Sequence, residues 1–203
     1  MTHTRKYERG HAGALPALIA GLILVGAGVA SCGINSAMDK ETMTAGLSSP
    51  TTSALQPLGA ANSSPKTQRP AEPGQRVIED VRIGTHDGFD RVVFEFSGYG
   101  DIGWFVDYTT APTQQGSNTQ IGYRGSTALN VNIDGVSKRS SVGLADRSFA
   151  IDEGTSGNIV EVIDVGTADS RAQFVIGLNA AVPYSVQVLE HPTRLVIDLV
   201  QTS

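Results

Sequence analysis

Cys32 is the residue whose position most clearly predicts chemistry, in this case covalent modification of a thiol. It is the one cysteine among the 203 residues, and it directly follows Val29-Ala30-Ser31. An apolar, uncharged run occupies residues 15–30, and the basic residues Arg5, Lys6 and Arg9 precede it. A basic start, a short apolar segment and small residues at its end predict a secretory signal peptide over residues 1–31.

The end of this segment, Val29-Ala30-Ser31-Cys32, resembles the lipobox of bacterial lipoproteins. The resemblance implies cleavage before Cys32, diacylglycerol on its thiol and an acylated new N-terminus, and two or more acyl chains anchor a protein stably. The alternative is a transmembrane anchor, but the run of about 16 residues is shorter than the roughly 20 that a spanning helix needs. We therefore expect the chain to be lipid-anchored through Cys32 at the extracytoplasmic face of a bacterial membrane.

A second group of residues could bind a ligand without reacting with it. Flat aromatic faces suit sugar rings, and arginine binds carboxylates through two parallel hydrogen bonds. The candidate ligand-binding residues are Phe105, Tyr108, Tyr123, Arg124 and Arg91. The alternative is structural, because such arginines often pair with neighbouring acids, here Glu95 or Asp198.

The aromatic residues around Trp104 divide between two faces of one predicted strand. Trp104, Val106 and Tyr108 alternate with Phe105 and Asp107. Because successive side chains of a strand point to opposite faces, Trp104 is expected in the core. Phe105 then points away from the core and becomes the exposed aromatic, unless a second layer covers it.

Patterns typical of catalysis or metal binding are weak beyond the signal peptide. His86 and His191 are the histidines there, and the adjacency of His86 and Asp87 does not orient one side chain against the other as a triad does. The sequence has no nucleophile elbow, phosphate-binding loop or dinucleotide motif. The acids near His86 lack the spacing of a calcium loop, and turn formation explains Asp87-Gly88. We therefore expect no enzyme, metal site or cofactor.

The charge of the chain also excludes function classes. Residues 1–31 hold three of the 15 Lys and Arg and one of the 20 Asp and Glu, so 12 basic and 19 acidic residues remain, a formal charge of −7. A mildly acidic chain without a basic block is a poor candidate for binding nucleic acid. With no further cysteine, the mature chain forms no disulfide and depends on its core for stability.

Composition divides the mature chain into two parts. Residues 32–74 are rich in Ser, Thr, Ala, Pro and Gly, and such a segment buries too little apolar surface to offset its ordering entropy. We therefore interpret residues 32–74 as the lipidated cysteine followed by a disordered tether. Residues 75–203 have the size and texture of one folded domain.

The folded part is predicted to be all-β. Alternation of period two is clear in Leu129, Val131 and Ile133, which alternate with polar residues. We expect an antiparallel β-sandwich of about eight strands, because no segment has a convincing helical period. The predicted strands are residues 77–83, 91–96, 104–109, 129–134, 159–165, 172–178, 184–189 and 195–200. Asp87-Gly88 predicts a turn between the first two, in a loop longer than two residues.

Two of these strand motifs resemble a known family. Residues 184–199 end in Arg194-Leu-Val-Ile-Asp-Leu199, which is similar to the close of an AMIN domain, and Gly84–Phe96 is similar to the early motif of AMIN-like domains in actinobacterial lipoproteins. The resemblance covers residues 76–200. It implies a β-sandwich without catalysis of its own, which binds peptidoglycan or places a partner in the envelope.

Three kinds of function follow as hypotheses. The first is a lipid-anchored module that binds peptidoglycan or other wall glycan without catalysis. The second is a protein-interaction module that recruits an envelope enzyme or a secretion partner through a strand edge or the Phe105 face. The third is a carrier that holds a small lipid ligand between its sheets.

Overall fold

The computed structural model describes residues 55–72, 74–145, 147, 149, 151–152 (backbone) and 157–201. All of them belong to a compact unit, Pro50–Ser203. The predicted signal peptide, Cys32 and the first part of the predicted tether lie outside the described residues. Within the described residues, no helix has the length and apolar character needed to cross a membrane.

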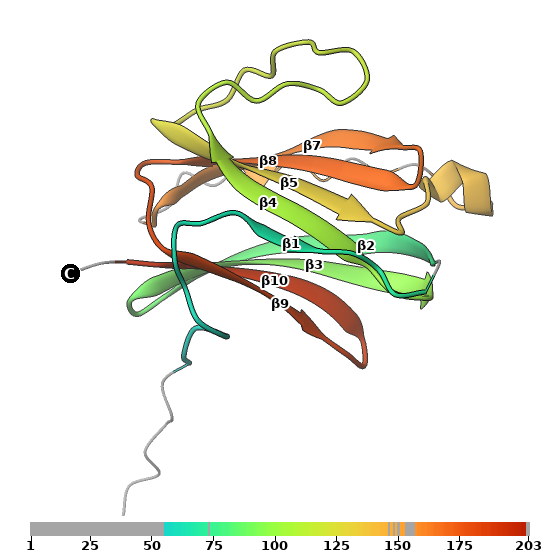
Figure 1. The fold of residues 1–203 in the computed structure, drawn as a ribbon, viewed down its shortest axis with the longest axis horizontal. Helices are drawn as coiled ribbons and strands as arrows, with labels where there is room; N and C mark the ends of the chain where they lie inside the picture. The colour runs from blue at the N-terminus through green and yellow to red at the C-terminus, as the bar shows by residue number, and fades with distance from the viewer. Residues whose placement is uncertain are drawn as a thin grey trace, which may run out of the picture. The chain divides into compact units, whose positions relative to one another are not determined.

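Ten strands in the described residues form two antiparallel sheets (Figure 1). The six-stranded sheet has the order β1-β4-β5-β8-β7-β6, and the four-stranded sheet has the order β2-β3-β10-β9. The strands are β1 (Lys66–Gln68), β2 (Gln75–His86), β3 (Phe89–Tyr99), β4 (Gly103–Thr109), β5 (Thr127–Asp134), β6 (Ile151–Asp152), β7 (Ile159–Ala168), β8 (Arg171–Leu178), β9 (Tyr184–Leu189) and β10 (Thr193–Val200); a short 3₁₀ helix, η1, spans Arg139–Val142.

The core lies between the two sheets, as the alternation predicts. In β5, Leu129, Val131 and Ile133 are fully buried, whereas Asn130 and Asn132 between them lie on the outer face and are half-buried. The rings of Phe94 in β3 and Phe174 in β8 meet across the two layers at 4.9 Å between centroids. The prediction of an all-β antiparallel sandwich is therefore confirmed, with all eight predicted strands present.

The structure corrects one detail of the predicted turns. β2 continues to His86 and β3 begins at Phe89, so the loop between them is the two residues Asp87-Gly88, not a longer one. Gly88 adopts φ 81°, a left-handed conformation that costs glycine little. His86 and Phe89 form the last pair of the β2–β3 ladder before the turn, and their rings stack at 4.7 Å between centroids.

A second correction concerns the predicted tether, which does not extend to residue 74. Residues 55–72, here called the N-terminal strap, lie on the sandwich, and β1 within them pairs with β4 as an edge strand of the six-stranded sheet (Figure 1). Asn62 and Tyr184 exchange two backbone hydrogen bonds of 3.1 Å each. Composition predicted disorder for this segment, but the segment is held mainly by backbone and polar contacts, which need few large apolar side chains.

Candidate ligand-binding site

Tyr108 occupies a structural position rather than an open surface. Its hydroxyl donates to the carbonyl oxygen of Val182 at 2.5 Å and accepts from the amide of the same residue at 3.0 Å. Its ring meets that of Tyr184 edge-on at 5.4 Å, and the hydroxyl of Tyr184 donates to the carbonyl of Val106. Burial raises the pKa of both phenols. The pair connects β4 with β9, one strand from each sheet.

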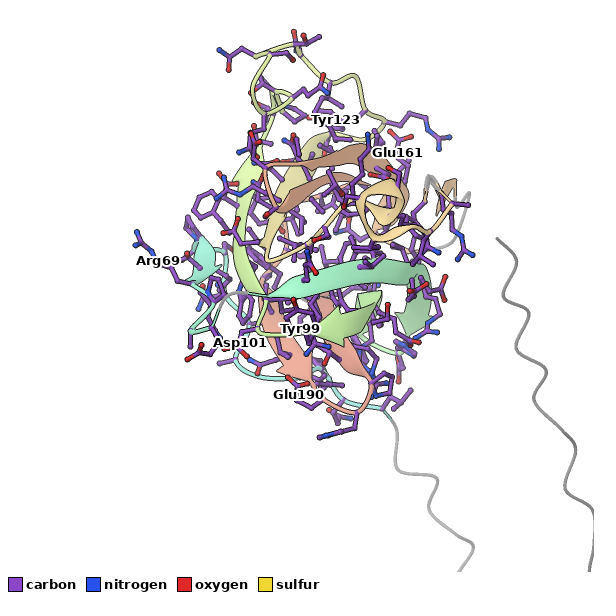
Figure 2. All side chains as sticks on the ribbon, turned by 90° about the vertical axis from the view of Figure 1, so that its right-hand side faces the viewer. Arg69, Tyr99, Asp101, Tyr123, Glu161 and Glu190 are labelled. Atoms are coloured by element: carbon purple, nitrogen blue, oxygen red, sulfur yellow. The ribbon has the colours of Figure 1, made fainter. Side chains whose placement is uncertain are left out.

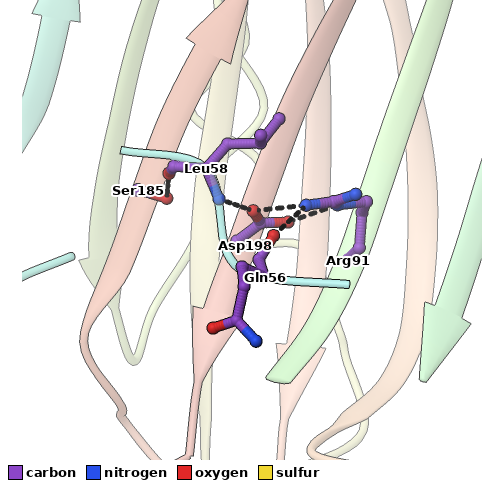
Figure 3. Close-up of polar contacts among 5 residues, drawn as sticks. All are labelled: Gln56, Leu58, Arg91, Ser185 and Asp198. Carbon is purple, nitrogen blue, oxygen red and sulfur yellow. Dashed lines mark hydrogen bonds and ion pairs between the residues drawn. The ribbon is translucent and has the colours of Figure 1, made fainter. Parts of the chain in front are cut away.

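Arg91 lies on the outer face of the four-stranded sheet, where it binds Asp198 (Figure 3). Its Nε and Nη2 atoms donate to the two carboxylate oxygens at 2.6 and 2.8 Å, and Asp198 is fully buried. The strap covers this pair, because the amide of Leu58 donates to Asp198 at 2.6 Å and Ser185 donates to the carbonyl of Leu58. The structural alternative for Arg91 is therefore confirmed.

Tyr123 and Arg124 stand at the end of the long loop between β4 and β5. The hydroxyl of Tyr123 donates to the carbonyl of Thr110 at 3.4 Å, and Arg124 forms an ion pair with Glu161 at 3.1 Å. Tyr123 and Glu161 lie toward the same end of the folded unit, well away from Tyr99 (Figure 2). Arg124 thus fastens the loop to β7, whereas Tyr123 joins the two ends of the loop, and neither residue lines the hollow beside Phe105 described next.

Phe105 lies on the outer face of the six-stranded sheet and is 42% exposed, while Trp104 beside it is buried. The predicted division of these two aromatics is confirmed. Next to Phe105 the sheet and the β4–β5 loop border an open hollow of about 400 Å³, here called the Phe105 groove. Its lining residues are Phe105, Thr113, Gln115, Asn130, Asn132, Arg171 and Gln173.

Gln173 positions the loop that forms one wall of this groove. Its side-chain oxygen accepts from the amide of Gln115 at 2.9 Å, and its nitrogen donates to the carbonyl of Thr113 at 2.9 Å. The same nitrogen donates to the side-chain oxygen of Asn130 at 3.1 Å. Because Gln173 is only 5% exposed, these bonds are expected to hold the loop firmly.

Asn132 is the amide most available to a ligand. The strand register places it between Phe105 and Gln173, on the same outer face. In the described part of the chain its side chain makes no hydrogen bond, so it has two donors and an acceptor to offer. A half-exposed ring beside neutral amides is an arrangement that can bind the face and the hydroxyl or amide groups of a sugar.

Asp107 adds a carboxyl group to the same sheet face. Burial raises the pKa of Asp107 above its usual value, and the hydrogen bond from Asn130 opposes this only in part. The raised pKa means that the folded state favours the neutral acid, so the stability contributed by this group falls as pH rises through the folded-state pKa.

Asp107→Asn is therefore expected to raise the free energy of unfolding at pH 7, since an amide carries no charge to bury and can still accept from Asn130. The gain should vanish near pH 3, where the native side chain is protonated in both states. Urea unfolding of both proteins at the two pH values would check this. Equal stability at pH 7 would show that the burial of Asp107 costs nothing.

Sequence reasoning identified one residue of the groove, Phe105, and missed its amides. The signal for Asn130 and Asn132 was available, because they alternate with the core residues Leu129, Val131 and Ile133 and so face outward. Gln173 left no such signal, because the residues on both sides of it in β8 are also buried.

The two sequence motifs behind the family resemblance lie next to each other in space. β3 and β10 pair in a register that sets Arg91 opposite Asp198 and Glu95 opposite Arg194. A family model described as the AMIN-like domain matches residues 76–201. The chain belongs to the AMIN-like family. Comparisons with curated proteins and with solved structures found no match.

Membership of the AMIN-like family places the chain in a functional setting. Such domains are associated with peptidoglycan-related proteins of the cell envelope, which indicates an extracytoplasmic location. They serve in general as binding or targeting modules without catalysis. In the described parts of this AMIN-like domain, no three His, Cys, Asp or Glu side chains gather where they could hold a metal ion.

Proposed function

We propose that the chain is a non-catalytic lipoprotein, anchored through Cys32 at the extracytoplasmic face of the membrane, whose AMIN-like domain binds peptidoglycan or another wall glycan. Its family and the signal-peptide pattern support the location. The observation that carries the binding function is the Phe105 groove, where a 42% exposed ring lies beside the amide of Asn132.

The physical basis is the match between this groove and a neutral N-acetylated sugar. A sugar has apolar C–H faces that contact a flat ring, and hydroxyl and amide groups that exchange hydrogen bonds with Asn and Gln side chains. The bonds of Gln173 hold the loop wall in place before binding, so little ordering cost is expected on association. A volume of about 400 Å³ is within the usual range of small-ligand sites.

Phe105→Ala is expected to weaken binding to purified sacculi about tenfold, or about 1.4 kcal/mol, because the sugar loses its aromatic contact. The measurement is co-sedimentation of the chain from residue 33 onward, over a range of salt concentrations. The matched control is Tyr99→Ala, since Tyr99 is an exposed aromatic (65%) on β3, outside the groove. The proposed site would be contradicted if sacculi failed to bind the wild-type chain, or if Phe105→Ala and Tyr99→Ala weakened binding equally.

A further inference from the structure

The Phe105 groove adjoins a second hollow, of about 240 Å³, here called the Lys138 hollow. The two share Gln115, Arg171 and Gln173 as walls. The Lys138 hollow follows the last residues of β7 and ends at Lys138, between β5 and η1. A ligand lying in the Phe105 groove could therefore extend past Arg171 toward Lys138.

A third hollow, of about 390 Å³, continues from the second and shares Lys138, Gly166 and Thr167 with it. It opens at the end of the space between the sheets, and Ile78, Phe149 and Phe174 form its apolar wall. We call it the inter-sheet mouth. The three hollows thus form a series in which each shares residues with the next.

The backbone at the junction leaves room for this passage. The pairing of β7 with β8 shifts register between Asp164 and Gly166, which marks a β-bulge. Gly166 has φ 119°, and a Cβ atom built on it would meet no atom within 4 Å. The amide of Gly166 donates to Asp164 at 2.9 Å, which holds the bulge in this shape.

Positive charge gathers along the second and third hollows, although the chain as a whole is acidic. Arg171 and Lys138 line the Lys138 hollow, and Arg139 and Arg147 join Lys138 at the inter-sheet mouth. Among the described lining residues of the three hollows Asp164 is the single acid; it is half-buried and accepts from the amide of Gly166.

The cations differ in how far neighbours already neutralise them. Arg171 pairs with Asp134, and Arg139 pairs with Glu79 at 2.8 Å. Arg147 donates to the carbonyl of Glu79 at 2.8 Å and lies over the ring of Phe149. Lys138 is exposed, and no ion pair engages it within the described residues. Its ammonium group is therefore the cation best placed to meet an anionic group of a ligand.

We propose that the three hollows together bind a branched ligand, a glycan that carries a short acidic peptide. The sugar lies in the Phe105 groove, a carboxylate of the branch meets Lys138, and apolar side chains of the peptide contact the inter-sheet mouth. This inference rests on the proposed function, which it extends from the sugar to the substituent that the sugar carries.

The test compares two soluble probes prepared from purified peptidoglycan: a disaccharide with its acidic peptide, and the same disaccharide after the peptide has been removed. We expect the chain from residue 33 onward to bind the first probe about tenfold more tightly, by titration calorimetry. Lys138→Gln is expected to remove most of that preference and to leave binding of the bare disaccharide unchanged. Phe105→Ala should weaken both probes.

The matched control is Arg69→Gln, which removes one positive charge from an exposed strap residue outside the three hollows. It should leave the preference intact. Equal affinity of wild type for the two probes, or a preference that survives Lys138→Gln, would overturn the inference while the glycan-binding function stands. Failure of wild type to bind either probe would overturn both.

Discussion

Arg91→Met is expected to lower the free energy of unfolding by about 3 to 5 kcal/mol, the usual cost of removing one partner from a buried ion pair. Asp198 is fully buried, and Arg91 engages both of its oxygens. Without the guanidinium, the carboxylate keeps the amide of Leu58 as a donor but has no charge partner. Urea unfolding followed by far-ultraviolet circular dichroism measures the loss.

The control for this prediction is Arg82→Met on the same sheet. Arg82 also pairs with acids, Asp80 and Glu95, but its side chain is 51% exposed. Exposed pairs of this kind contribute about 0 to 1 kcal/mol, so little change is expected. The double variant Arg91→Met/Asp198→Leu should recover much of the loss, because it leaves no buried charge. Similar losses for Arg91→Met and Arg82→Met would contradict this account of the buried pair.

Removing the N-terminal strap is the second change with a large expected effect. A chain that begins at Gln75 should be less stable, by about 3 kcal/mol, than one that begins at Leu55. The shorter chain loses the bond from Leu58 to the buried Asp198, which as a bond to a charged group contributes roughly 1.5 to 3 kcal/mol. It also loses the two backbone bonds of Asn62 with Tyr184.

The same truncation uncovers an edge strand. β1 pairs with β4 through three residues, Lys66–Gln68, and without it β4 becomes the edge of the six-stranded sheet. Unpaired edges associate readily, so the chain from Gln75 should also form oligomers that size-exclusion chromatography detects. Leu58→Pro in the longer chain tests the hydrogen bond between Leu58 and Asp198 by itself, because proline lacks the N–H that donates to Asp198. Identical unfolding midpoints for the two chains would show that the strap contributes no stability.

Some of the contacts behind these predictions could be predicted from the sequence, and others could not. The alternation in β5 predicted a strand with Leu129 and Ile133 inside, since that pattern depends only on the two-residue period of the backbone. Within β4 the same period correctly separated Trp104 from Phe105. The prediction made from composition failed for residues 55–72, because low apolar content predicts disorder only where a segment must bury its own side chains.

The fold class, the core-facing side of each principal strand and the AMIN-like family could be predicted from the residues, because they follow from local periodicity and from motifs within single strands. The distribution of the five candidate ligand-binding residues could not be predicted in this way, because it depends on how the strands are ordered in the two sheets. The tertiary structure places Arg91 under the strap, Tyr108 between the sheets and Phe105 beside the amides of β5 and β8. Strand order sets these neighbours, and it brings together residues as far apart in the chain as Phe105 and Gln173, which no local pattern encodes.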